Sequence, residues 1–221
     1  VILLASRNDD PKDVLFADDA GAPDLTYSWA SGRGFYWTEG RTGLGWAVGA
    51  IPTLKGGSAL GIPSPPAIWF PRRRTLETPT IRDAERLQGF EPDWTIAAET
   101  VDNSRGARWR LVGNSVCVPM MEWLGTCLNT PGRYDGLSDR SLTDGDSLPT
   151  AGWGGDGRFM VASVSEWPKT EPLATINSFL KYGTSLLSLR AARGFYRRAT
   201  ADSTNLRIEP EFLADVAHHI S

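Results

Sequence analysis

The chain has 221 residues, of which 41% are hydrophobic and 22% are charged, and its formal net charge is −3. These values are typical of a soluble globular protein with one large domain or two small ones, and they exclude a polycation that binds nucleic acid with its whole surface. Two cysteines, Cys117 and Cys127, are too few for a disulfide scaffold, and no apolar run approaches the roughly 20 residues of a membrane span.

The first third of the chain predicts short strands separated by loops. Residues 1–6 (VILLAS) are an apolar run closed by turn formers, which predicts a buried strand, and its abrupt start leads us to expect further protein upstream. Residues 17–34 predict a loop. Glycine and proline recur every few positions in residues 35–71, which excludes a helix and favours short strands, with one at Ala67–Phe70. This stretch is either a small loop-rich β-subdomain or a binding surface in which glycines let the backbone approach a ligand.

Residues 80–89 (TIRDAERLQG) predict a short helix. Thr80 is a suitable N-cap, Asp83 suits the positive end of the helix dipole, and Gly89 is a suitable stop. Arg82, Glu85 and Arg86 are spaced three and four residues apart and share one helix face. They form either a solvated ion-pair face or an internal scaffold that fixes two neighbouring loops.

Gly113, Asn114 and Ser115 predict a turn that leads into a helix at 115–128. That helix would carry a buried apolar stripe at helical spacing, made of Val116, Met120, Trp123, Leu124, Cys127 and Leu128. Backbone N–H groups at such a helix start suit a carboxylate or a phosphate, although most turns of this kind are simple caps.

The remainder of the chain predicts a linker followed by mixed elements. Residues 129–158 are rich in glycine, serine and aspartate, and residues 159–167 predict a strand. Helical patterns follow at 172–189, with a break near Gly183, at 186–200 and at 210–220. Arg190, Arg193 and Arg197 lie three and four positions apart, and Arg198 follows directly, which indicates either a DNA-backbone stripe or a solvated face. We expect no metal site, because the neighbouring His218 and His219 would point apart on a helix.

Two motifs together are more specific than either one. The sequence TIRDAERLQGF, followed about twenty residues later by VGNSVCVP, resembles the last two conserved motifs of DNA cytosine-5 methyltransferases. Residues 52–57 (PTLKGG) resemble the Thr-Leu-x-x-Gly-Gly region of the family's target recognition domain, and VILLASRND resembles the tail of the motif before it. The resemblance covers about residues 1–128.

The resemblance implies an α/β fold. The chain would be the C-terminal part of an S-adenosylmethionine-dependent methyltransferase fold, with a small loop-rich β target recognition domain and an extra α+β C-terminal region. The expected parts are the end of the catalytic-domain strand region at 1–16, the recognition domain at 17–74, the closing motifs at 75–130, a linker at 131–158 and a C-terminal extension at 159–221.

The resemblance also implies a reaction, the transfer of a methyl group from S-adenosylmethionine to carbon 5 of a cytosine flipped out of duplex DNA. The family's nucleophilic cysteine follows a proline, and neither Cys117 nor Cys127 does. The Glu-Asn-Val segment and the glycine-rich cofactor loop are absent as well. We therefore expect no catalytic residue in this chain and no activity from it alone, with the catalytic portion in the same or a separate chain. A non-catalytic DNA-binding subunit of a split methyltransferase and an inactive remnant are the alternatives.

The matching positions give three sets of expected site residues. The cofactor set is Gly113, Asn114, Ser115 and Val116, beside Leu111, where the family often has glutamine. The set for double-stranded DNA is Thr53, Lys55, Gly56, Gly57, Ser58, Arg72, Arg73 and Arg74, although the three arginines could equally form a solvated basic turn. The structural set is Arg82, Asp83, Glu85 and Arg86. The expected setting is the cytoplasm of a prokaryote or phage, in association with the nucleoid and without a membrane partner.

Overall fold

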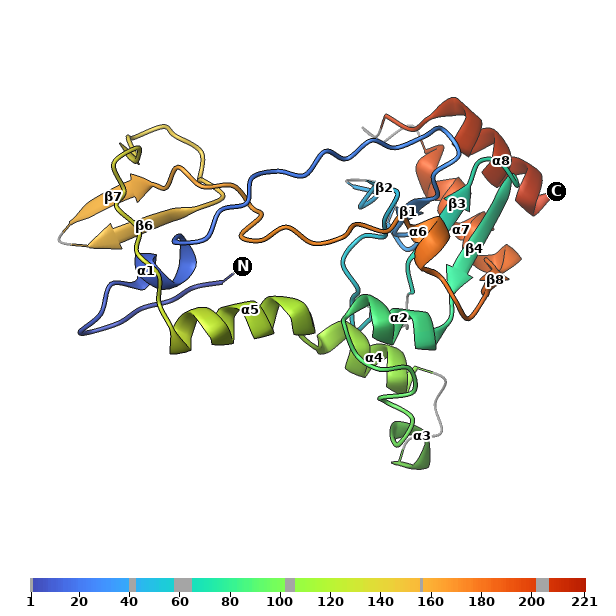
Figure 1. Ribbon diagram of the computed structural model, residues 1–221. Coiled ribbons are helices and arrows are strands. Elements are labelled where there is room, and N and C mark those ends of the chain that lie inside the picture. Colours follow the sequence, from blue (N-terminus) through green and yellow to red (C-terminus); the bar gives the residue numbers. More distant parts are fainter. Residues whose placement is uncertain (1, 40–42, 58–64, 102–105, 156, 202–206) are drawn as a thin grey trace. The chain divides into compact units, whose positions relative to one another are not determined.

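The computed structural model describes residues 2–39, 43–57, 65–101, 106–155, 157–201 and 207–221 (Figure 1). The chain forms two compact units. Unit 1 is Val1–Leu25 with Pro119–Pro172, and unit 2 is Thr26–Val118 with Leu173–Ser221. Within the described ranges, no helix has the length and apolar character needed to cross a membrane.

Unit 2 is built on a five-stranded antiparallel sheet in the order β2-β1-β3-β4-β8 (Figure 1). Its strands are β1 (Arg33–Phe35), β2 (Ala47–Val48), β3 (Ala67–Phe70), β4 (Thr75–Pro79) and β8 (Thr184–Leu186). The strand predicted at Ala67–Phe70 is confirmed, and all four of its residues are buried. Burial of every residue means that both faces of this strand are covered, since successive side chains point to opposite faces of a sheet.

Different elements cover the two faces of the sheet. Helices α7 (Leu189–Ala199) and α8 (Pro210–Ile220) cover one face, where Phe35 and Trp69 pack against Phe195 and Phe212. On the other face, Ile68 and Phe70 pack against Ile176 of α6 (Ile176–Phe179), with Leu87 of α2 (Ile81–Leu87) beside them. Trp69 also donates a 2.9 Å hydrogen bond from Nε1 to Asp215 of α8.

The C-terminal residues are therefore part of the sheet that carries the predicted recognition region. The division between the two units runs through the predicted extension at 159–221, because Leu173–Ser221 belongs to unit 2. The helices predicted at 186–200 and 210–220 are confirmed as α7 and α8. The helical pattern at 172–189 is wrong over most of its length, because the one-turn helix α6 is followed by Gly183 at φ 77° and then by strand β8.

Three helices form the motif region of unit 2. They are α2 (Ile81–Leu87), α3 (Ala98–Val101) and α4 (Ala107–Asn114). Thr80 caps α2 by accepting a hydrogen bond from the backbone N–H of Asp83, and Gly89 has a φ of 87°, so the predicted start and stop of this helix are confirmed. The turn predicted at Gly113 is wrong. Gly113 and Asn114 are the last residues of α4, and the next helix begins only at Val118.

Unit 1 contains α1 (Pro11–Leu15), all but the first residue of α5 (Val118–Asn129) and a three-stranded sheet in the order β5-β7-β6. These strands are β5 (Arg140–Ser141), β6 (Gly152–Gly155) and β7 (Arg158–Val161). The stretch predicted as a linker thus holds two strands, and the strand predicted at 159–167 is confirmed only at its start. The carboxylate of Asp139 joins this unit together, because it accepts hydrogen bonds from the Tyr134 hydroxyl, from Trp153 Nε1 at 2.7 Å and from the backbone of Ser163 at 3.0 Å.

Two apolar predictions in unit 1 are wrong. Residues 2–6 form no strand, and Leu3 is 93% exposed, because a strand exists only where a neighbouring strand satisfies its backbone. The stripe predicted on the 115–128 helix is buried only at Cys127, whereas Met120 and Leu128 in unit 1, and Val116 at the end of unit 2, are exposed. Both patterns are apolar enough for a core, and neither meets one within its own unit.

Removing an aromatic side chain from α8 should destabilise unit 2 as a whole. Phe212 is fully buried against Phe35, Trp46 and Trp69, so Phe212→Ala should lower the free energy of unfolding by about 3–5 kcal/mol. Urea unfolding followed by tryptophan fluorescence measures this change. Phe159→Ala is the matched control, because Phe159 is 66% exposed and its loss should cost no more than about 0.5 kcal/mol. Equal effects of the two substitutions would show that α8 is not part of the core.

Candidate functional site

The first buried carboxylate of α2, Asp83, holds the segment that leads into β8. It accepts backbone hydrogen bonds from Lys181 at 3.1 Å and from Tyr182 at 2.9 Å, and a 2.6 Å side-chain bond from Arg86. Arg86 also donates to the carbonyl oxygen of Phe179 at 2.8 Å and lies over the ring of that residue. This pair therefore connects α2 to the C-terminal part of unit 2.

The second buried carboxylate, Glu85, faces the loop that follows α2. Its side chain is fully buried and accepts hydrogen bonds from the backbone N–H groups of Asp93 at 2.6 Å and Thr95 at 2.9 Å. Arg108 of α4 donates to the same carboxylate at 3.0 Å. Burial alone would raise the pKa of Glu85, but the hydrogen bonds from Thr95, Arg108 and Asp93 outweigh burial and lower it.

Arg108 is the cation at the centre of this cluster. It pairs with Glu85, Asp93 and Glu99, each at 3.0 Å, and donates from Nε to the Thr95 hydroxyl. Burial opposes the charge of this guanidinium, and the three carboxylates more than compensate, so the pKa of Arg108 is raised. Prediction from sequence missed Arg108, because it lies 23 positions from Glu85 and no local pattern joins the two.

The structural set predicted from sequence thus contains buried residues, here called the inner members, and an exposed residue, Arg82. Asp83 and Glu85 are fully buried, whereas the side chain of Arg82 is 44% exposed, pairs with Asp93 at 2.9 Å and lies over the ring of Tyr182. The contacts of the inner members are those of an internal scaffold, since each carboxylate fixes a separate segment through backbone N–H groups.

Gln88 joins the end of α4 to the start of α5. Its side-chain amide donates to the carbonyl oxygen of Val112 at 3.0 Å, and its backbone carbonyl oxygen accepts from the backbone N–H of Val118 at 2.8 Å. The Ser115 hydroxyl also donates to the carbonyl oxygen of Val112, at 2.7 Å. These bonds satisfy groups that a helix leaves unpaired at its ends.

Two glycines bring the predicted cofactor residues against the predicted DNA residues. A Cβ atom on Gly113 would lie 2.1 Å from the carbonyl carbon of Lys55 and 2.2 Å from the nitrogen of Gly56. A Cβ atom on Gly56 would lie 2.0 Å from Oδ1 of Asn114. We call Lys55, Gly56, Gly113 and Asn114 the glycine joint. Gly113 packs against backbone and Gly56 packs against the Asn114 side chain, each at a distance that a side chain at that glycine would prevent.

The loop at 52–57, which we predicted to be the recognition loop, presents alternate side chains to solvent. Thr53 and Lys55 are exposed, and Leu54 between them is buried. The Tyr36 hydroxyl donates to the carbonyl oxygen of Thr53 at 2.6 Å, and Nζ of Lys55 lies 3.7 Å from the centre of the same ring. Gly57 is half-buried beside the joint. Ser58, also predicted to contact DNA, lies outside the described residues.

The three arginines predicted to contact phosphate lie in the turn between β3 and β4. Arg74 pairs with Asp215 at 2.7 Å, and Arg73 pairs with Glu77 at 3.4 Å and covers the ring of Phe70. No ion pair joins Arg72 to a residue that the structure describes. Two of these three charges are therefore already compensated by carboxylates of unit 2.

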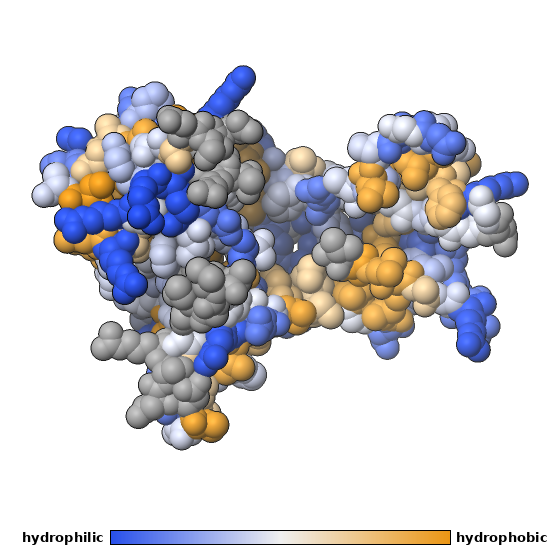
Figure 2. All heavy atoms as spheres, turned by 180° about the vertical axis from the view of Figure 1, so that it is seen from behind, coloured by the Kyte–Doolittle hydropathy of each residue, from blue (hydrophilic) through white to orange (hydrophobic). Residues whose placement is uncertain are grey.

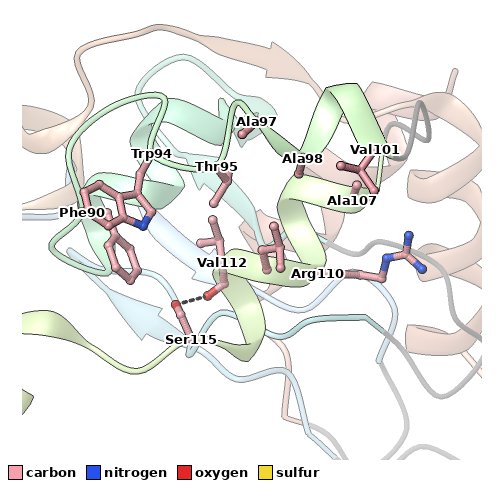
Figure 3. A pocket seen from close by; sticks show the side chains of 11 residues that line it. Phe90, Trp94, Thr95, Ala97, Ala98, Val101, Ala107, Arg110, Val112 and Ser115 are labelled. Atoms are coloured by element: carbon pink, nitrogen blue, oxygen red, sulfur yellow. Dashed lines mark hydrogen bonds between the residues drawn. The ribbon is translucent and has the colours of Figure 1, made fainter.

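A pocket of about 720 Å³ opens between the loop after α2 and helix α4 (Figure 3). Phe90 and Trp94 lie side by side on one wall, with ring centres 5.6 Å apart, and Val112 and Ser115 lie beside them. Most of its lining is apolar, and Trp94 is 65% exposed. Its size is within the range of small-molecule sites, and Ser115 connects it to the predicted cofactor set. Prediction from sequence missed this pocket, for which Phe90 and Trp94 were the available signal.

The chain is 46% identical over 222 residues to the Type II methyltransferase M2.BsuMI of Bacillus subtilis (strain 168). The match covers 96% of this chain and 56% of that protein, so the chain spans about half the length of the curated relative that it matches. No family model and no solved structure matches the chain. The chain is accordingly a homologue of a type II methyltransferase.

The buried Glu85 should make the stability of unit 2 depend on pH. Its pKa in the folded protein lies below the ordinary value of 4.5, so its contribution is present above about pH 4.5 and is lost as the pH falls below that value. Glu85→Gln should cost about 3–5 kcal/mol at pH 7, because Arg108 loses a buried partner. Urea unfolding from pH 7 to pH 3 should show this difference shrinking only below about pH 4.5. A difference that stays constant with pH would contradict a charged Glu85.

A methyl group at the glycine joint should displace the loop at 52–57. Gly113→Ala should cost about 1–3 kcal/mol of stability, because backbone atoms of Lys55 and Gly56 must move. Gly125→Ala in α5 is the matched control. Nothing lies within 4 Å of its Cβ position, so it should stabilise its helix by about 0.5–1 kcal/mol. Urea unfolding of both variants measures these changes, and a neutral Gly113→Ala would disprove the close packing of the joint.

Proposed function

We propose that the chain is the C-terminal portion of a DNA (cytosine-5)-methyltransferase, in which it recognises duplex DNA and completes the S-adenosylmethionine pocket. The observation that carries this proposal is the glycine joint. It brings residues that match the family's last motif into contact with residues that match the recognition domain. The similarity to a type II methyltransferase over 96% of the chain supports it independently.

The end of α4 suits the cofactor role. Asn114 and Val116 are exposed, and Ser115 lines the pocket beside Phe90 and Trp94. A polar rim beside an exposed aromatic ring fits a ligand that carries an amino-acid group, a cationic sulfonium and a flat base. Bound S-adenosylmethionine would supply the methyl group. Ser115, Asn114 and Val116 would hold its methionine part, and Gly113 would keep them against the recognition loop.

The exposed side chains of the recognition loop suit phosphate contacts. Thr53 and Lys55 project from a backbone that Leu54 and the glycine joint fix. Contacts of this kind position a protein on duplex DNA, and base contacts select the sequence. Of the three arginines in the β3–β4 turn, Arg73 and Arg74 already have carboxylate partners, so Arg72 is the one best suited to add a phosphate contact.

Neither cysteine of the chain is suited to attack a cytosine ring. Cys127 is buried in α5, and burial together with a hydrogen bond to Asp18 raises the pKa of its thiol, which disfavours the reactive thiolate. Cys117 is half-buried just before α5. The nucleophile then belongs to a catalytic portion in the same or a separate polypeptide. The exposed apolar side chains Met120, Met121 and Leu128 of α5 offer a surface for that portion.

Methyl transfer from labelled S-adenosylmethionine to duplex DNA tests this proposal. The 221-residue chain alone should incorporate no label above a protein-free control. Addition of the part of M2.BsuMI that the match does not cover should restore incorporation, and nucleoside mass spectrometry should identify 5-methylcytosine. Incorporation by the chain alone would contradict the proposal, as would an N-methylated base.

A further inference from the structure

Positive charge is concentrated in one C-terminal segment of unit 2. Residues 181–200 contain one lysine, four arginines and no carboxylate, whereas the chain as a whole has a net charge of −3. Helix α7 carries all four arginines. A segment that carries only positive side chains creates a local positive potential that attracts polyanions, even in a protein whose net charge is negative.

Three of these arginines lie on one face of α7. Arg190, Arg193 and Arg197 are exposed, and the opposite face, with Ala192, Phe195 and Ala199, is buried against the sheet. None of the three has an ion pair to a described residue. From behind, hydrophilic side chains gather on the part of unit 2 where α7 lies (Figure 2).

Helix stability does not account for this arginine face. Arg197 is favourable in the last turn, but Arg190 lies in the first turn, where a positive charge opposes the helix dipole. Gly194 lies among the three arginines in the helix interior, where glycine is less stable than alanine. Gly194 is half-buried, and a guanidinium nitrogen of Arg198 lies 3.4 Å from the position that a Cβ atom would occupy.

The C-terminal end of α7 is connected to the predicted recognition loop through Arg198 and Glu39. Arg198, the last arginine of α7, donates to the carbonyl oxygens of Trp37 at 2.6 Å and Glu39 at 2.9 Å. The carboxylate of Glu39 pairs with Nζ of Lys55 at 3.5 Å. The C-terminal end of α7 thus lies next to the segment that contacts Lys55.

We infer that the arginine face of α7 (Arg190, Arg193 and Arg197) binds the phosphate backbone of duplex DNA beside the recognition loop. This inference rests on the proposed function, in which unit 2 recognises DNA. Arg190 and Arg197 are about 10 Å apart along the helix axis, since each residue rises 1.5 Å. Each DNA strand carries one phosphate per 3.4 Å of axis, so three flexible arginines can reach about three phosphates of one strand.

The salt dependence of DNA binding tests this inference. The chain and the triple variant Arg190→Gln/Arg193→Gln/Arg197→Gln are titrated into a fluorescent 30-base-pair duplex of arbitrary sequence between 50 and 300 mM salt. At about 150 mM salt the variant should bind at least tenfold more weakly, and its slope of log K against log salt should be shallower by about 2–3, which corresponds to three lost phosphate contacts. An unchanged slope would overturn the inference.

A charge-matched control separates the face from net charge. The variant Arg7→Gln/Arg133→Gln/Arg158→Gln also loses three exposed charges, all in unit 1, and should keep the slope of the original chain. Circular dichroism should show the same thermal unfolding for the α7 variant as for the original chain, because the three side chains are exposed. An equal loss of slope in the control variant would overturn the assignment to α7.

The outcomes also separate this inference from the proposed function. If the original chain binds the duplex and the α7 variant binds with the same slope, only the inference fails. If the original chain does not bind duplex DNA, both fail. If it binds vesicles of phosphatidylcholine with 30% phosphatidylserine and no DNA, and the α7 variant loses that binding, the face is a membrane contact and the inference is wrong.

Discussion

Glu85 is a carboxylate without access to solvent, and it is stable there because Arg108 and two backbone N–H groups replace the water that it lost. A buried ion of this kind costs several kcal/mol unless its partners are in place. The constraint fixes three segments at once: helix α2, the loop that begins at Phe90, and helix α4. The pocket beside Trp94 and the end of α4 lie where they do because this ion pair holds them.

Helices α4 and α2 each position a further part of unit 2. At the C-terminal end of α4, Gly113 and Asn114 pack against Lys55 and Gly56, so the residues predicted to bind the cofactor contact residues predicted to bind DNA. On the other side of α2, Asp83 holds the segment that enters β8, and through it the C-terminal helices that cover the sheet. Within unit 2, these contacts therefore join the five-stranded sheet, helices α2 and α4, and residues 173–221.

Local chemistry predicted the elements that depend on neighbours in sequence. The Thr80 cap, the stop at Gly89, the strand at Ala67–Phe70 and the helix that starts at Pro210 follow from residues within a few positions. Contacts over long distances could not be predicted. Arg108 pairs with a carboxylate 23 residues away, and β8 joins β4 across more than a hundred residues. The burial predicted from the apolar patterns at 1–6 and in α5 was wrong, since an apolar pattern does not say which surface, if any, packs on it.

The claim that the two motifs form one structural unit is tested most directly by a double-mutant cycle between Glu85 and Arg108. The free energy of unfolding is measured for the original chain, for Glu85→Gln, for Arg108→Met and for the double variant at pH 7. A buried charged hydrogen bond that joins α2 to α4 predicts a coupling energy of about 2–3 kcal/mol. A coupling energy below about 0.5 kcal/mol would mean that the two residues act independently, and it would contradict the account.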